Sequence, residues 1–124
     1  SAPSVATGTS NVAGTNLAIN GSKGTGTGVG GAVQIKTAPV GASGVNQNTL
    51  QTRLSVDGPG NVIVGNAALA TTATNGFLYI PTCAGSPTGT PTSYTGNVPL
   101  IFDTADSKIY VYTGSTWKAT AALS

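Results

Sequence analysis

The chain has 124 residues and a formal net charge of +2, and only 6% of its residues are charged, against about 25% in an average globular protein. It contains no His, and its one cysteine is Cys83. These counts exclude an intrachain disulfide and a zinc site built from His and Cys side chains. The few Lys and Arg residues are scattered singly, so they do not form the basic stripe that nucleic-acid binding requires.

The apolar content predicts an ordered chain with a thin core. Leu, Ile, Val and Phe make up roughly a fifth of the residues, near the level at which disorder is expected, but disorder also needs a high net charge. Small folds with thin cores are stabilised by disulfides, metals or oligomerisation. Because the first two are excluded, the composition predicts an oligomer. No run approaches the roughly 18 apolar residues of a membrane span, so we expect no membrane insertion.

We expect three regions along the chain. Residues 1–16 are small and polar and predict an extended N-terminal arm. Residues 17–75 are rich in Gly and Thr and predict a β fibre region, and residues 76–124 predict a C-terminal module. The first strand of the fibre region is a minimal one at 17–19. The only candidate helical turn is at 66–74, where the Thr content argues against a longer helix.

Glycines alternate with other residues in the first part of the fibre region. Period two puts these glycines on one face if the segment is extended. A face without side chains permits close approach of a second backbone, which is either a symmetry mate near an axis or an adjacent turn of chain. The alternating positions are candidate residues of an interface between copies of the chain: Gly24, Gly26, Gly28 and Gly30.

Three strands are predicted after the glycines. Residues 32–37 alternate, with Val33 and Ile35 inward, and residues 50–57 form the strongest strand of the chain. The sequence at 58–61, Gly-Pro-Gly-Asn, predicts a turn, and 62–64 returns as a hairpin. On the 50–57 strand, one face is expected to carry Leu50, Thr52, Leu54 and Val56.

All the aromatic residues follow Gly76. Residues 77–80 predict a short strand, and the four prolines of 81–99 predict an extended, wrapping connection. Alternation then predicts an antiparallel meander of strands at 100–103, 108–113 and 116–118. Both faces of its middle strand carry large side chains, so one face needs a partner. We therefore add Phe102, Tyr110 and Tyr112 to this candidate interface between copies, and take Tyr94 and Trp117 as a candidate ligand surface.

Two stretches carry a resemblance to a known class of proteins. The C-terminal run PLIFDTADSKIYVYTGSTWKA, with its lead-in GFLYIPTCAGSPTGTPTSYTGNVPL, resembles the end of many bacteriophage fibre and fibre-like virion surface proteins. RLSVDGPGNVIVGN resembles a second recurrent element of such fibres. The resemblance implies an all-β fold with little or no helix: an elongated, interwoven homotrimeric fibre or prism that ends in an antiparallel meander.

The resemblance also implies a role and a place. It points to a trimeric tail fibre or spike on the virion surface, assembled in the bacterial cytoplasm, that contacts other virion proteins and a host-surface glycan or protein. Capsid decoration, as a cement or head-fibre protein, is the alternative. Two further hypotheses are less favoured: a segment of a bacterial surface adhesin, and a fragment of a polysaccharide-degrading spike.

The sequence gives little support for a catalytic or nucleotide-binding site. Asp103 and Asp106 flank a predicted turn; two carboxylates can hydrolyse glycosides at about 5 to 10 Å separation, but turn capping is the favoured reading. Gly26, Gly28 and Gly31 match a dinucleotide-binding spacing, yet a strand rather than a helix follows them. Cys83 has no neighbour in sequence that would activate a thiolate, so a buried structural cysteine is the favoured interpretation. We therefore expect no catalytic residue, no cofactor and no metal.

Overall fold

The computed structural model describes residues 4, 6–8 and 10–123, and this part of the chain contains strands and no helix. The expectation of an all-β chain is thus confirmed at the level of secondary structure. The chain divides into two compact units, Ser1–Phe77 and Leu78–Ser124. Residues 1–3, 5 and 9 of the predicted arm lie outside the described residues.

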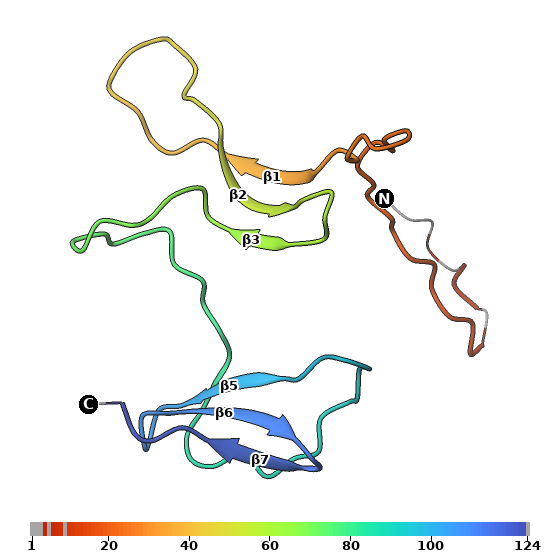
Figure 1. The fold of residues 1–124 in the computed structure, drawn as a ribbon, viewed down its shortest axis with the longest axis vertical. Helices are drawn as coiled ribbons and strands as arrows, with labels where there is room; N and C mark the ends of the chain where they lie inside the picture. The colour runs from red at the N-terminus through yellow and green to blue at the C-terminus, as the bar shows by residue number, and fades with distance from the viewer. Residues whose placement is uncertain (1–3, 5, 9, 124) are drawn as a thin grey trace. The chain divides into compact units, whose positions relative to one another are not determined.

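The first unit contains a three-stranded antiparallel sheet (Figure 1). Its strands are β1 (Val33–Thr37), β2 (Gln51–Val56) and β3 (Val62–Val64), in the order β1-β2-β3. The predicted turn joins β2 to β3 and is closed by a hydrogen bond from the Gly60 N–H to the Asp57 carbonyl at 3.1 Å. These three strands and their turn confirm the sequence prediction.

Two predictions for this unit are wrong. Residues 17–19 form no strand, and the exposure of Leu17 (62%) and Ile19 (70%) shows that no sheet covers them. Residues 66–74 contain bends and one turn, closed by the Ala73 N–H on the Ala70 carbonyl at 3.0 Å, instead of a helical turn. The Thr-rich sequence explains the second result, because β-branched side chains disfavour a helix.

The alternating glycines fold back on themselves instead of running straight. The Gly28 N–H donates to the Thr25 carbonyl at 2.9 Å, and the Gly31 N–H to the Ser22 carbonyl at 2.8 Å. Gly26 lies in this turn with φ +55°, in the left-handed region that glycine favours. The close backbone approach that the sequence predicts therefore occurs here within one chain.

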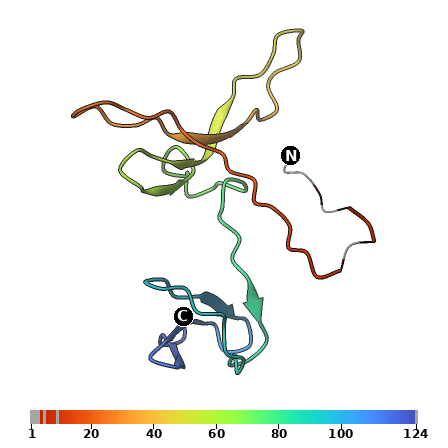
Figure 2. The same cartoon turned by 90° about the vertical axis from the view of Figure 1, so that its right-hand side faces the viewer.

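The second unit contains a four-stranded sheet in the order β4-β5-β6-β7; its strands belong to the green-to-blue end of the chain in Figure 2. Strands β5 (Leu100–Asp103), β6 (Lys108–Thr113) and β7 (Thr116–Ala119) form the predicted antiparallel meander. The strand expected at 77–80 is wrong: the chain forms β4 (Thr82–Cys83) instead, and β4 pairs with β5 in parallel. Parallel pairing needs a long connection, and the Pro-rich segment between β4 and β5 provides it.

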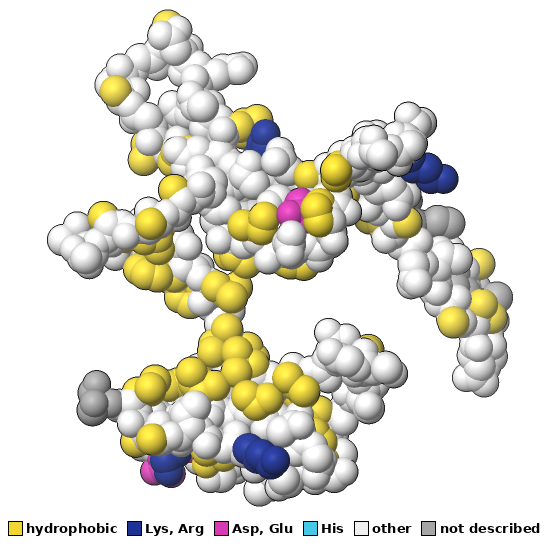
Figure 3. Space-filling model, in the orientation of Figure 1, with side chains coloured by type: hydrophobic (Ala, Val, Ile, Leu, Met, Phe, Trp, Pro, Cys, Tyr) yellow, Lys and Arg dark blue, Asp and Glu magenta, His cyan; other side chains and the backbone are white. Residues whose placement is uncertain are grey.

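Little apolar surface is buried. Among the described residues, Tyr110 is the one hydrophobic residue that is buried; the other buried residues are Ser55 and Asp103. Figure 3 shows hydrophobic side chains open on the surface and few charged ones. Within the described part, no helix is long and apolar enough to cross a membrane.

Candidate functional site

The C-terminal meander brings three of the predicted aromatic residues onto one face of its sheet. Tyr112 lies opposite Trp117 in the β6–β7 pairing, and Tyr110 is two residues from Tyr112 on β6. Opposite residues and residues two apart share a face. The rings of Tyr112 and Trp117 pack edge to face, with centroids 5.3 Å apart. We call the side of the sheet that carries these three residues the aromatic face.

Residues 84–99, which we call the strap, connect β4 to β5 and cover part of the aromatic face. The Trp117 indole N–H donates to the Gly89 carbonyl at 2.8 Å. The Ser86 hydroxyl and the Tyr110 hydroxyl share a hydrogen bond of 2.6 Å, and Tyr110 is only 7% exposed. Segments of the same chain thus bury the tyrosine that we expected a partner chain to cover.

Asp103 fixes the beginning of the strap. Its Oδ1 accepts hydrogen bonds from the N–H groups of Gly85 at 2.8 Å, Ala105 at 2.9 Å and Asp106 at 3.4 Å. The residue has no exposed surface. Burial alone would raise the pKa of Asp103, but these hydrogen bonds and the charge of Lys108 outweigh burial and lower the pKa below its ordinary value of 3.8. Asp103 therefore caps the β5–β6 turn and holds the strap to it.

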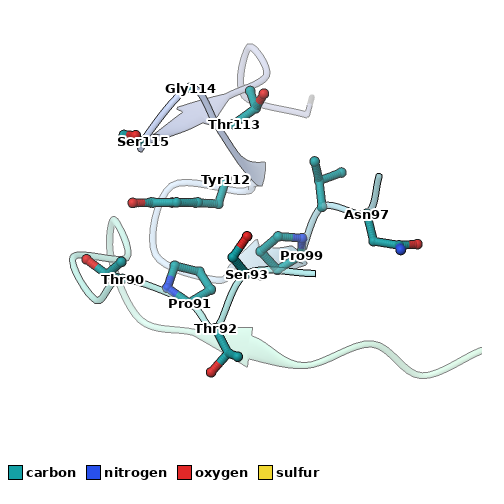
Figure 4. Close-up of a pocket in the computed structure, with 11 residues that line it drawn as sticks. Thr90, Pro91, Thr92, Ser93, Asn97, Pro99, Tyr112, Thr113, Gly114 and Ser115 are labelled. Carbon is teal, nitrogen blue, oxygen red and sulfur yellow. The ribbon is translucent and has the colours of Figure 1, made fainter. Parts of the chain in front are cut away.

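Two open hollows lie between the strap and the β6–β7 hairpin, with volumes of about 390 and 470 Å³. Tyr112 lines both hollows, and so do Thr90 of the strap and Ser115 of the hairpin turn. Figure 4 shows the first hollow, with the Tyr112 ring between the strap residues Thr90 and Pro91 and the turn residue Ser115. The Tyr112 ring thus forms a wall common to both spaces.

Tyr94 and Trp117, the predicted ligand surface, do not line a common hollow. Trp117 lines the hollow of about 470 Å³, and its indole N–H is already bonded to the strap. Tyr94 is 71% exposed and begins a tight turn, closed by the Asn97 N–H on the Tyr94 carbonyl at 3.0 Å. Tyr94 instead lines a third, more apolar hollow of about 350 Å³, which adjoins the hollow of about 390 Å³ and shares Pro91 and Pro99 with it.

The candidate interface residues are likewise spread over several surfaces. The four glycines lie in the first unit, in the turn described above. Phe102 pairs with Ile109, one position away from Tyr110, so it lies on the opposite face of the sheet from the aromatic face. Phe102 and Ile109 are both half-buried.

The other two carboxylates are engaged locally. Asp57 accepts hydrogen bonds from Asn61 and Gly60 in the β2–β3 turn; those from the Asn61 side chain and backbone contribute most to lowering the pKa of Asp57. Asp106 lies 3.7 Å from the Lys108 ammonium. Within the described residues, no group of three or more His, Cys, Asp or Glu side chains could hold a metal ion.

Cys83 lies half-buried on β4. Its thiol donates to the Gly85 carbonyl, with the sulfur 3.1 Å from the oxygen, beside the backbone that Asp103 binds. This arrangement fits the structural role that the sequence favours for Cys83.

Comparison of the chain with protein-family models, with curated proteins and with solved structures finds no match in any of the three.

Sequence reasoning missed the strap as part of the site. The predicted wrapping connection had the right composition, but its partner surface was not identified. The signal was present in the spacing: Ser86 and Gly89 lie in a Pro- and Thr-rich stretch just before the aromatic strands. Pro restricts such a stretch to extended backbone, whose free carbonyls suit a Trp donor.

Proposed function

We propose that the chain is a structural protein of a bacteriophage-like particle: a homotrimeric fibre or spike that projects from the particle and takes part in host attachment. In this role the protein catalyses no reaction. Backbone pairing and packing between copies make a rigid, weakly charged projection. The proposal is supported by one structural observation, the exposed apolar face of the first unit, together with the sequence resemblance to phage fibres.

The sheet of the first unit presents a continuous aliphatic face. Val56 of the central strand lies opposite Val33 on one side and Val62 on the other. Leu54, two residues before Val56, lies opposite Ile35 and Val64 in the same way. Because opposite residues share a face, six aliphatic side chains lie on one side of this sheet. We call it the aliphatic face; its members are Val33, Ile35, Leu54, Val56, Val62 and Val64.

The aliphatic face is open within the single chain. Val62 is 67% exposed, Ile35 55% and Val64 48%. A sheet normally packs its apolar face against a second layer, and the described chain places none here. Contiguous apolar patches of this kind mark interaction surfaces in soluble proteins.

The resemblance to phage fibres supplies the number of copies, three, and the location on a particle.

Immunogold electron microscopy tests the role. An antibody raised against the chain should label projections on purified particles from cells that carry the gene. Label found only in the particle-free fraction would contradict a virion structural role. Extracts of cells that lack the gene provide the control for antibody specificity.

A further inference from the structure

We propose that the two hollows beside Tyr112 form a binding site for a neutral saccharide. The inference rests on the second unit alone, so it does not depend on the trimer or on the particle. Its starting point is the shared wall: the Tyr112 ring, Thr90 and Ser115 line both hollows. Volumes of about 390 and 470 Å³ fall in the range of sites that hold small ligands.

The chemistry of the lining selects the class of ligand. No Asp, Glu, Lys or Arg lines either hollow, so nothing there compensates a ligand charge. The polar groups are mostly hydroxyls, which both donate and accept hydrogen bonds. A purely apolar ligand would leave these hydroxyls without partners, at a cost in affinity. The hydroxyl-bearing residues on the two walls include Thr90, Ser93, Thr113, Ser115 and Thr116.

A pyranose ring has the matching surfaces. One side of the sugar presents C–H groups that pack flat on an aromatic ring, and its edge presents hydroxyls that donate and accept hydrogen bonds. Tyr112 offers such a ring, and it is half-exposed (Figure 4). Its hydroxyl makes no hydrogen bond within the described chain, in contrast to the Tyr110 hydroxyl, which is bonded to Ser86.

The Tyr112 ring, the proposed platform for the sugar, is held in place without a ligand. The Trp117 ring packs against the Tyr112 ring in a T-shaped pair and is itself fixed by the bond to Gly89. Gly114 and Ser115 have φ values of +60° and +64°, as in a tight two-residue hairpin turn. This turn fixes the side of the hollow that Ser115 lines. A rigid site loses little entropy on binding. A proline-rich peptide is the less favoured ligand, because the strap of the same chain already accepts the indole N–H that would recognise it.

Trp117 is the only tryptophan of the chain and touches Tyr112, so its fluorescence reports on the site. The full chain is titrated with maltotetraose, cellotetraose and chitotetraose, and with sialyllactose and trigalacturonate as charged comparisons. At least one neutral sugar should change the emission saturably, and saturation-transfer NMR should show the strongest transfer to C–H protons on one face of one pyranose. The charged sugars should bind at least about tenfold more weakly, because the site offers no counter-charge.

Substitutions locate the site. Tyr112→Ala should weaken binding at least about tenfold, since the platform is lost. Tyr112→Phe keeps the ring and should bind within about threefold of the original. Tyr79→Ala, at a tyrosine that is 86% exposed and lines neither hollow, should bind unchanged.

Several results would overturn the proposal. The first is that no neutral sugar binds at concentrations up to about 10 mM. The second is that Tyr112→Ala and Tyr79→Ala reduce sugar affinity equally. The third is that a proline-rich peptide binds and no sugar does. The NMR measurement uses the unmodified protein, so a folding defect in a variant cannot mask the answer. Particle labelling is measured separately, so failure here leaves the structural role to its own test.

Discussion

At the scale of single residues, Asp103 at the end of β5 joins the strap to the β5–β6 turn. Its carboxylate gathers N–H groups from the strap and from the β5–β6 turn, and the side chain is wholly buried. Oδ1 accepts all of these hydrogen bonds, whereas Oδ2 is buried without a partner in the described part of the chain. Asp103 therefore holds the beginning of the strap, and the Trp117–Gly89 and Ser86–Tyr110 hydrogen bonds hold it further along.

The lowered pKa of Asp103 gives a stability that depends on pH in one direction. Because the folded pKa lies below 3.8, the contribution of the carboxylate is complete above about pH 5 and is lost as pH falls through the folded value. With no His in the chain, the thermal midpoint should be constant between about pH 5 and 9 and should fall below about pH 4.

Asp103→Asn should lower the thermal midpoint at pH 7 by several degrees and reduce the acid-induced fall. Its amide NH2 would be buried where Oδ2 has no partner, and its neutral oxygen would accept more weakly than the carboxylate from Gly85 and Ala105. Asp57→Asn, at a turn in the other unit, provides the comparison and should leave the unfolding of the strap unchanged. Calorimetry at a series of pH values measures both. An unchanged midpoint in Asp103→Asn at pH 7 would refute the role given to this residue.

The hydroxyl of Tyr110 makes a second prediction at this scale. Tyr110→Phe removes the bond to Ser86 and should reduce the free energy of unfolding by about 1 kcal/mol. Tyr79→Phe loses a hydroxyl on a residue that is 86% exposed and should change it by less than about 0.5 kcal/mol. Urea denaturation of the two variants provides the measurement, and equal effects would mean that the strap is not held through Tyr110.

At the scale of elements, the meander and the β2–β3 hairpin were predictable because period-two alternation and turn residues carry their information locally. Strand β4 was not, because two residues at Thr82–Cys83 have no pattern of their own, and their pairing with β5 depends on the strap and on Asp103. The sequence placed Trp117 on a ligand surface but assigned Tyr112 to an interface between copies, and the hollows around Tyr112 required knowing where the strap lies. The sequence predicted close backbone approach in the glycine segment. It did not predict that the segment folds back on itself, because alternation of glycines also fits a straight strand.

Two glycine substitutions separate the turn from a flexible spacer. A Cβ added at Gly24 would overlap the carbonyl oxygen of Gly28, whereas one added at Gly44 meets nothing within 4 Å. Gly24→Ala should therefore open the turn and lower the free energy of unfolding by about 1 kcal/mol or more, while Gly44→Ala should be neutral or slightly stabilising. Denaturant unfolding followed by the NMR signals of residues 22–31 compares them. If the two variants behave alike, this segment is a spacer.

At the scale of the whole molecule, the aliphatic face explains why a chain with so little buried apolar surface is expected to assemble. Val64 and Ile63 are neighbours on β3 with similar exposure, 48% and 45%, but they lie on opposite faces of the sheet. They therefore form a matched pair. Val64→Lys should prevent assembly by placing a charge in the interface, and Ile63→Lys should assemble nearly as the unchanged chain does. Native gels of the two variants decide between a specific face and general stickiness, for which both would fail alike.

Sedimentation equilibrium of the unchanged chain in native buffer tests the central claim most directly. If copies cover one another's aliphatic faces in a trimer, the mass should be three times 12.1 kDa over a wide range of concentrations, and the folded signal should be lost together with assembly on dilution or denaturation. A species of 12.1 kDa that remains folded, with a cooperative thermal transition independent of concentration, would contradict it.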